Sequence, residues 1–236
     1  MKISNSSYPL VEHESQIFNS LLDFDDRHIL ELGCGKAEFT RLIASEGQAR
    51  RVVAMEVDEV QHRANLEATR PDNLEFKYGG AEAITLEDES QDIVLMFKSL
   101  HHVPMALLDQ AINEIHRVLK PGGSLYISEP VFAGEFNEIL RLFHDEEQVR
   151  QAAFNASKKA VDLGLFELRE QVFFSSPVKF DSFADFENQL INVTHTQHQL
   201  DKDTLAAVKK RYESFANNGN LSLSAPQRVD LLYRNN

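Results

Sequence analysis

The chain has 236 residues, a length that fits one α/β domain with a modest insertion and a sizeable core. Its 24 Lys and Arg against 37 Asp and Glu give a formal charge of −13, which disfavours binding to a nucleic-acid backbone. One cysteine excludes an internal disulfide framework and a multi-cysteine zinc cluster, and so favours a reducing compartment.

The first residues, MKISNSSYPL, lack the apolar region of a signal peptide, and no apolar run reaches the length of a membrane span. We therefore expect a cytoplasmic protein with no membrane partner. Within residues 1–24, apolar side chains recur at roughly helical spacing from Leu10 onward. This pattern predicts a lead-in helix that packs on the sheet or covers a site as a lid.

Residues 28–40, HILELGCGKAEFT, organise the rest of the chain, because they predict a buried strand, a tight turn and a helix. Gly33 and Gly35 allow backbone conformations closed to other residues and let a ligand approach the main chain closely. The free N–H groups of the following helix start then face a ligand above the carboxyl end of the strand.

The spacing of this loop separates two kinds of nucleotide site. A dinucleotide fingerprint needs a third glycine at the position of Glu38, where a carboxylate opposes the phosphates. Glu31 adds a second negative charge, so a ligand with a positive centre and no phosphate suits the loop better. A plain tight turn between a strand and a helix would also carry two glycines, and that alternative stays open here.

An apolar run at 51–57 predicts a second strand that ends in acidic residues. A carboxylate roughly 20 residues past a glycine loop is placed to accept hydrogen bonds from ribose hydroxyls. Glu56 is favoured for this role over Asp58, which with Glu59 better fits the amino terminus of the next helix. Further apolar runs predict strands at 74–78, 92–97, 124–128, 165–174 and 228–233.

Helical spacing predicts helices at 59–69, from Pro104 to Leu119 and within 135–163. About 50 residues separate the last two strands, which is more than a hairpin needs. Asp181 and Asp201 have the character of helix caps. We interpret residues 178–217 as a helical insertion over a substrate pocket, while an edge decoration or a dimer contact stays open.

The segment ELGCGKAEF resembles the E/D-x-G-x-G-x-G motif of class I S-adenosylmethionine-dependent methyltransferases of the type 11/12-like group, with Ala37 at the third glycine position. The acidic end of the second strand, the apolar fourth strand and a Lys-Pro-Gly-Gly turn starting at Lys120 are further landmarks of that family. The resemblance implies an α/β fold with a Rossmann-like, seven-stranded, mostly parallel sheet and helices on both faces. Residues 1–236 would then form a single methyltransferase domain.

The resemblance implies S-adenosylmethionine as the cofactor. In the family a Gly-Asp-Ala sequence follows the third strand and offers its acid to the adenine amino group, but here Gly80 stands at the acid position. Adenine contacts then fall to the backbone around Ala81 and to Glu82. The cofactor-binding residues expected from the resemblance are Glu31, Gly33, Cys34, Gly35, Glu56, Ala81, Glu82 and Lys98.

Methyl transfer is an in-line displacement in which alignment alone can remove about 7 to 11 kcal/mol of barrier. A general base is needed only for a protonated acceptor. The candidates are His101 and His102, which follow the fourth strand, and Glu129 at the end of the fifth. Glu135 and His144 could also contact an acceptor.

Two motifs of nucleic-acid methyltransferases, Asn/Asp-Pro-Pro-Tyr and Pro-Cys, are missing from the chain. The expected function is methyl transfer to a small-molecule acceptor, whose acceptor atom (N, O, S or C) stays open. The alternative is a non-catalytic, cofactor-binding regulatory or interaction protein with the same fold. No metal site is expected, because His195 and His198 lack nearby acids at suitable spacing. A monomer and a homodimer are equally compatible with the sequence.

Overall fold

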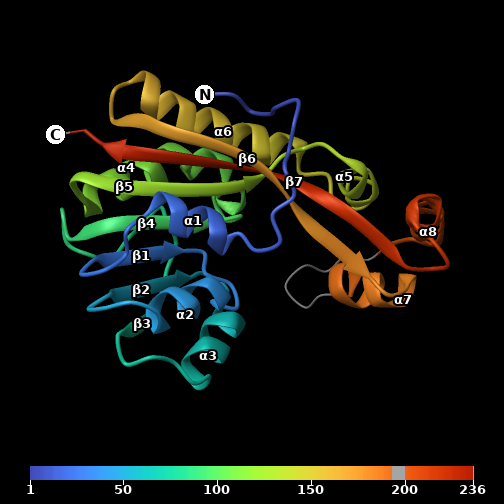
Figure 1. The fold of residues 1–236 in the computed structure, drawn as a ribbon, viewed down its shortest axis with the longest axis horizontal. Helices are drawn as coiled ribbons and strands as arrows, with labels where there is room; N and C mark the ends of the chain where they lie inside the picture. Colours follow the sequence, from blue (N-terminus) through green and yellow to red (C-terminus); the bar gives the residue numbers. More distant parts are fainter. Residues whose placement is uncertain (193–199, 236) are drawn as a thin grey trace.

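Seven strands form one sheet in the order β3-β2-β1-β4-β5-β7-β6 (Figure 1). The computed structural model describes residues 1–192 and 200–235, so His195 and His198 lie outside the described residues. The first five strands are parallel, and β7 runs antiparallel to both of its neighbours. The mostly parallel sheet is therefore confirmed. The strands are β1 (His28–Leu32), β2 (Arg51–Glu56), β3 (Leu74–Tyr78), β4 (Gln91–Phe97), β5 (Leu119–Pro130), β6 (Phe166–Phe180) and β7 (Leu221–Arg234).

Helices cover both faces of this sheet. Along β1, Ile29 packs in a core with α1 and α2, whereas Leu30 and Leu32 pack in a second core with α4 and α6. Because successive side chains of a strand point to opposite faces, burial on both sides explains the continuous apolar runs. The helices are α1 (Ser15–Leu21), α2 (Glu38–Ser45), α3 (Glu59–Glu67), η1 (Leu100–His102), η2 (Met105–Leu107), α4 (Leu108–Val118), α5 (Glu135–Leu140), α6 (Glu147–Asp162), α7 (Phe183–Phe186), η3 (Glu187–Ile191) and α8 (Lys202–Phe215). Among these described helices, none combines the length and apolar character needed to cross a bilayer.

Two helix starts differ from the prediction. The lead-in helix α1 begins only at Ser15, because the residues before it run beside β6. There the Ser175 amide donates to the Pro9 carbonyl and the Val11 amide donates to the Ser175 carbonyl, both at 2.9 Å. Pro104 precedes the 3₁₀ turn η2, so α4 begins four residues later than the sequence predicts, at Leu108.

The last two strands are longer than predicted and leave the sheet as a two-stranded ribbon (Figure 1). The pairing of β5 with β7 reaches the Pro130–Gln227 pair, beyond which β7 pairs with β6 as far as Leu221 and Phe180. The predicted strand ends at Phe174, and a Ser-Ser-Pro sequence follows it in the chain. An edge strand tolerates this proline, since its missing N–H faces away from the neighbouring strand.

A third hydrophobic core lies at the far end of the ribbon, where α5, α7, η3 and α8 meet. Ser182 caps α7 by accepting from the Asp185 amide at 3.1 Å, so the predicted cap at Asp181 is one residue early. Asp201 caps α8 as predicted and accepts from the Thr204 amide at 2.7 Å. The buried residues of this core are Ile139, Phe180, Phe186, Ile191, Val208, Tyr212 and Leu221.

Candidate active site

A cleft of about 850 Å³ lies at the carboxyl ends of β1, β2 and β4. Ligands of open α/β sheets bind at this edge, because the loops after parallel strands converge there. The structure brings together all eight residues that the sequence predicts for the cofactor, and each of them lines this cleft, which we call the cofactor cleft: Glu31, Gly33, Cys34, Gly35, Glu56, Ala81, Glu82 and Lys98.

The glycine loop takes the conformations that its residues predict. Gly33 and Gly35 have φ values of +70° and +51°, in the left-handed region that favours glycine. A Cβ added to Gly33 would lie 2.6 Å from the Cβ of Ser99, so the loop also needs the missing side chain there. Ala37, at the third glycine position, adopts the same left-handed region at φ 57°. Burial raises the pKa of the Cys34 thiol, which makes this side chain unreactive.

Glu56 and Asp58 have separate roles. Glu56 is 7% exposed, and its Oε2 accepts a hydrogen bond from the Gly35 amide at 2.7 Å. Its Oε1 accepts from the amides of Val57 and Asp58 at 2.8 and 2.9 Å. The Asp58 side chain instead caps α3 by accepting from the Val60 amide at 2.8 Å. Glu56 therefore ties the end of β2 to the glycine loop, whereas Asp58 serves the helix.

Glu31 lies at the bottom of the cofactor cleft and is 3% exposed. The Thr40 hydroxyl donates a hydrogen bond to its Oε2. Burial, reinforced by the nearby carboxylates of Glu56 and Glu14, raises the pKa of Glu31 to about 8. Glu31 is therefore mostly protonated at neutral pH while the cleft holds no cation.

Glu82 occupies the space that a side chain at position 80 would need. A Cβ added to Gly80 would lie 2.4 Å from Oε2 and 2.6 Å from Oε1 of Glu82. The Glu82 carboxylate thus stands next to position 80, where the sequence resemblance implies an acid. The absence of a side chain at Gly80 leaves room for the Glu82 carboxylate, so an acid at position 82 takes the place of an acid at position 80.

Lys98 links the cofactor cleft to the lead-in segment. Its Nζ lies 3.1 Å from Oε2 of Glu14, the residue that precedes α1. Glu14 is buried, and its Oε1 accepts from the Tyr126 hydroxyl at 3.4 Å. The sequence prediction missed Glu14, because no local pattern distinguishes it from the neighbouring acid Glu12.

A second cleft of about 550 Å³ adjoins the first, and Lys98 and His102 line both. Its walls come from segments that lie far apart in the sequence. We call it the acceptor cleft and define it by its lining residues: Lys98, His101, His102, Pro130, Val131, Ala133, Phe136, Asn137, Leu140, Phe143, His144, Glu146, Arg150, Gln189, Leu190, Ala225, Pro226 and Gln227.

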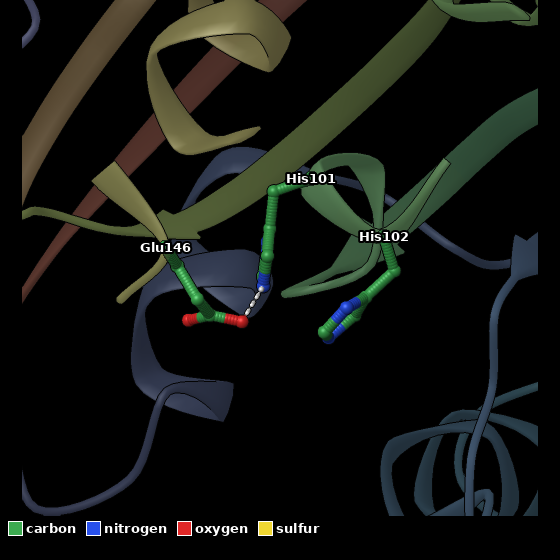
Figure 2. A group of neighbouring side chains, drawn as sticks. All are labelled: His101, His102 and Glu146. Carbon is green, nitrogen blue, oxygen red and sulfur yellow. Dashed lines mark ion pairs between the residues drawn. The ribbon is translucent and has the colours of Figure 1, made fainter. Parts of the chain in front are cut away.

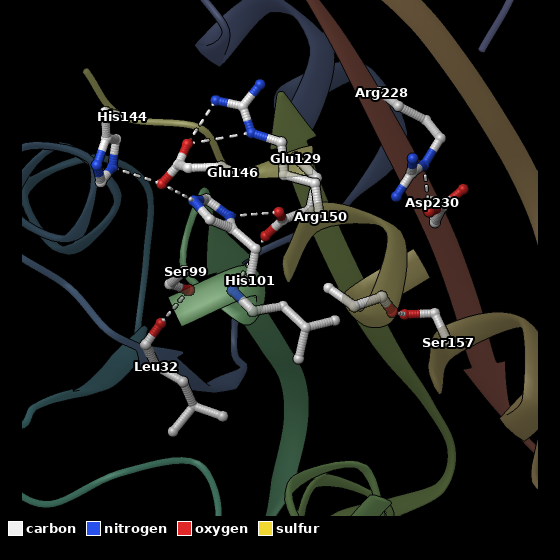
Figure 3. A network of polar contacts seen from close by, with 12 residues as sticks. Leu32, Ser99, His101, Glu129, His144, Glu146, Arg150, Ser157, Arg228 and Asp230 are labelled. Atoms are coloured by element: carbon white, nitrogen blue, oxygen red, sulfur yellow. Dashed lines mark hydrogen bonds and ion pairs between the residues drawn. The ribbon is translucent and has the colours of Figure 1, made fainter. Parts of the chain in front are cut away.

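Two of the predicted catalytic candidates, His101 and Glu129, belong to a buried network beside the acceptor cleft (Figure 3), whereas His102 is exposed. The Nδ1 atom of His101 lies 2.5 Å from Oε2 of Glu129, and the Leu100 amide donates to the other oxygen at 3.0 Å. Both carboxylate oxygens of Glu129 are therefore engaged, one by the His101 ring and the other by the Leu100 amide. The opposite ring nitrogen of His101, Nε2, lies 3.6 Å from Oε1 of Glu146, a residue that the sequence prediction missed.

Charges in this network balance one another. Burial disfavours a charged His101, but Glu129 and Glu146 outweigh it and raise the pKa of His101 to about 9. Against the effect of its own burial, Glu146 has a pKa held below the usual range by His101 and by Arg150, which contacts its Oε2 at 2.6 Å. Partial burial and the charge of His101 lower the pKa of His102.

The two remaining candidates differ in position. The Nε2 atom of His144 lies 2.8 Å from Oε1 of Glu146, so His144 belongs to the same network. Glu135 is exposed in the first turn of α5, outside the buried network.

The comparisons with known proteins agree with this geometry. A family model described as a methyltransferase domain matches residues 30–127. An uncharacterised methyltransferase of Schizosaccharomyces pombe is 32% identical over 63% of this chain and 58% of its own length. A protein of Mycolicibacterium smegmatis named as a probable S-adenosylmethionine-dependent methyltransferase is 35% identical over 51% of this chain and 46% of its own. The match therefore spans about half the length of these relatives.

A solved structure of a methyltransferase candidate from Bacillus halodurans superimposes with a TM-score of 0.62 and 17% identity, and covers 93% of this chain and 97% of the other. At this identity the likeness shows the fold alone. The family match covers the glycine loop, the acidic end of β2 and the strand before the two histidines. Residues 30–127 therefore match the methyltransferase-domain family, and the named relatives support a class I S-adenosylmethionine-dependent methyltransferase, with which the fold agrees.

Proposed function

We propose that this protein transfers a methyl group from S-adenosylmethionine to a small-molecule acceptor. The observation that carries the proposal is that the cofactor and acceptor clefts meet, with Lys98 and His102 lining both. The cofactor supplies a methyl group on a positively charged sulfur, so the protein mainly has to hold two reactants in line. Acceptor atoms of all four kinds, N, O, S and C, are compatible with such a displacement.

The lining of the cofactor cleft fits a cationic nucleoside without phosphates. Glu56 lies at the end of β2, where its carboxylate can accept hydrogen bonds from ribose hydroxyls. Glu31 at the bottom of the cleft suits the amino-acid ammonium group, because a nearby cation favours its charged form. Gly33, Cys34 and Gly35 offer backbone to the same ligand.

Adenine recognition falls to Glu82 and to the backbone around Ala81. The Glu82 carboxylate lies where a family acid at position 80 would begin, which supports a contact with the adenine amino group. The departure at Gly80 is then compensated within two residues. This compensation favours a working cofactor site over a non-catalytic protein that only keeps the fold.

The acceptor cleft fits a small, mostly apolar molecule with a polar hydrogen. Its apolar walls include Phe136, Leu140 and Leu190. Gln227 is 4% exposed, and its Oε1 has no hydrogen-bond partner among the described residues. A buried, unpaired carbonyl oxygen is costly, so an N–H or O–H of the acceptor is its natural partner. The charge of −13 disfavours a polyanionic acceptor.

Two parts of the single domain, residues 1–24 and 178–217, would close the site. Glu14 of the lead-in segment pairs with Lys98, and Gln189 and Leu190 of the insertion line the acceptor cleft. We therefore assign the insertion the role of a substrate cover and the lead-in segment that of a lid. The lone, buried Cys34 is compatible with a cytoplasmic location.

Calorimetric titration with S-adenosylmethionine, S-adenosylhomocysteine and NADH tests the proposed cofactor. Binding of the two sulfur compounds without NADH is the expected result. Small apolar amines, phenols and thiols are then screened for transfer of an isotopically labelled methyl group. Failure of both sulfur compounds to bind would contradict the proposal, and binding without transfer to any acceptor would favour a regulatory protein.

A further inference from the structure

We propose that His101, His102 and Glu146 form a binding site for a divalent first-row transition-metal ion in the acceptor cleft. One ligand atom from each side chain lies within 4.8 Å of the other two. In Figure 2 the two rings and the carboxylate converge on one space below η1. Tetrahedral zinc with bonds of about 2.0–2.2 Å needs neighbouring ligand atoms about 3.4 Å apart. The 3.6 Å between Nε2 of His101 and Oε1 of Glu146 is already close to this spacing.

The surroundings of His101 are those of a metal-binding histidine. Such histidines almost always engage a carboxylate or carbonyl through the ring nitrogen that does not bind the metal. Here Glu129 holds Nδ1 at 2.5 Å, and the Leu100 amide fixes Glu129 in turn. These contacts direct Nε2 towards Glu146, where coordination would replace the proton on this nitrogen.

The Glu146 carboxylate is held in place as firmly as the His101 ring. Arg150 binds its Oε2 at 2.6 Å, and Oε1 is left facing His101 and His144 (Figure 3). The Nε2 atom of His144 contacts the same Oε1 at 2.8 Å. The carboxylate is thus held by groups on α6 and in the preceding loop before any ion arrives.

The donor set selects the class of ion. Two imidazoles and one carboxylate suit zinc, iron and cobalt, whereas magnesium and calcium prefer oxygen ligands throughout. Three protein ligands leave coordination positions open, as in catalytic zinc sites. Because all three residues line the acceptor cleft, an open position faces the space assigned to the acceptor.

An acceptor oxygen bound to this ion would lose its proton more readily, because a divalent ion lowers the pKa of a coordinated hydroxyl or water. This role narrows the acceptor class to molecules with a metal-binding oxygen. It rests on the proposed methyl transfer, whereas metal binding itself does not depend on it.

Calorimetric titration of the full chain with ZnCl₂ tests the site. The protein carries no polyhistidine tag and is treated with a chelator beforehand, and Mg²⁺ serves as the hard-ion comparison. We expect one zinc ion per chain, and at least tenfold weaker binding for His102→Ala and Glu146→Gln. Glu129→Gln, which replaces the carboxylate beside Nδ1 of His101 with a neutral amide, should weaken zinc binding about 10- to 100-fold.

His28→Ala is the matched control, because His28 lies at the amino end of β1, whereas the clefts lie at the carboxyl ends of the parallel strands. It should bind zinc like the unaltered protein. Unchanged zinc affinity in His102→Ala would overturn the proposal, and so would magnesium binding as tightly as zinc. His102→Ala keeps the Glu146–Arg150 pair, so its result decides the question even when Glu146→Gln does not fold. Zinc binding without S-adenosylmethionine binding would contradict the proposed function and leave the metal site standing.

Discussion

The cofactor cleft and the acceptor cleft are built in different ways. The cofactor cleft takes its lining from short segments that directly follow the parallel strands β1 to β4. The acceptor cleft draws on η1, the loops around α5, the start of α6, η3 and the bend of β7. The carboxyl ends of parallel strands lie at the same end of the sheet, so local sequence patterns are enough to predict the cofactor cleft. The second depends on where a ribbon leaves the sheet and on what packs at its far end.

This difference predicts that substitutions separate into two groups. Changes at residues that line only the cofactor cleft should alter cofactor affinity, whereas changes at residues that line only the acceptor cleft should alter acceptor use alone.

The largest effect is expected for Glu56→Ala. Loss of charge-assisted hydrogen bonds worth about 1.5–3 kcal/mol should weaken S-adenosylmethionine binding about 10- to 100-fold in calorimetry. Asp58→Ala is the control, because its side chain caps α3. It should lower the stability by about 1 kcal/mol and leave cofactor affinity unchanged. The assignment of the ribose contact would move to Asp58 if the two variants exchanged these results.

The acceptor cleft is tested by Leu190→Ala. Removal of this apolar wall should raise the KM for the acceptor about tenfold, with cofactor affinity unchanged, since about 1.4 kcal/mol of apolar contact is lost. Steady-state kinetics with an identified acceptor measures the change. Leu163→Ala, at an exposed leucine, should behave like the unaltered protein. Equal KM values for all three proteins would reduce the insertion to an edge decoration.

Substitutions at positions 80 and 82, where an acid at 82 replaces the family's acid at 80, should have a smaller effect on cofactor affinity. Glu82→Ala should weaken cofactor binding about fivefold through loss of one adenine hydrogen bond. Gly80→Asp combined with Glu82→Ala should restore the affinity, because it places the acid where the family carries it. Calorimetry on the single and double variants measures both steps. A double variant as weak as Glu82→Ala would show that neither acid reaches the adenine.

The smallest expected effect is the release of a proton from Glu31 when the cofactor binds. A pKa of about 8 keeps this acid protonated in the free protein, and a bound ammonium group would favour the carboxylate. Cofactor binding at pH 7 should therefore release up to one proton, and affinity should rise as the pH approaches 8. Titrations in two buffers with different ionisation enthalpies measure this release, which Glu31→Gln should abolish.

The raised pKa of Glu31 also makes the free energy of unfolding depend on pH. An acid whose pKa is about 8 when folded and near the ordinary 4.5 when unfolded binds its proton more tightly in the folded state. Its contribution to stability is full below pH 4.5 and is lost as the pH rises towards 8. Denaturant unfolding across this range should show a flatter pH profile for Glu31→Gln, and parallel profiles would contradict the raised pKa.

Local sequence patterns determined the strand and helix framework and the cofactor cleft. β3 has the predicted bounds, β1 lies within the predicted strand-turn-helix segment, and the glycine loop has the predicted positive φ angles. These features depend on short-range chemistry: apolar runs for strands buried on both faces, and glycines where the left-handed region is needed. The choice of Glu56 over Asp58 is likewise favoured by position alone, and the hydrogen bond to the Gly35 amide supports it.

The tertiary structure alone decided which distant side chains meet. Glu14 reaches Lys98 because residues 9–11 run along β6, and Glu146 reaches His101 because α6 packs against η1 and the sheet. Neither pair leaves a periodic or spacing signal, since charged partners far apart in the chain are joined only by the packing of the elements between them. The sequence prediction underestimated the length of the β6–β7 ribbon for a related reason. Its outer half is stabilised by the third core, formed with α5, α7 and α8, although the alternation of Leu221 and Leu223 with the exposed Ser222 and Ser224 was a local signal for β7.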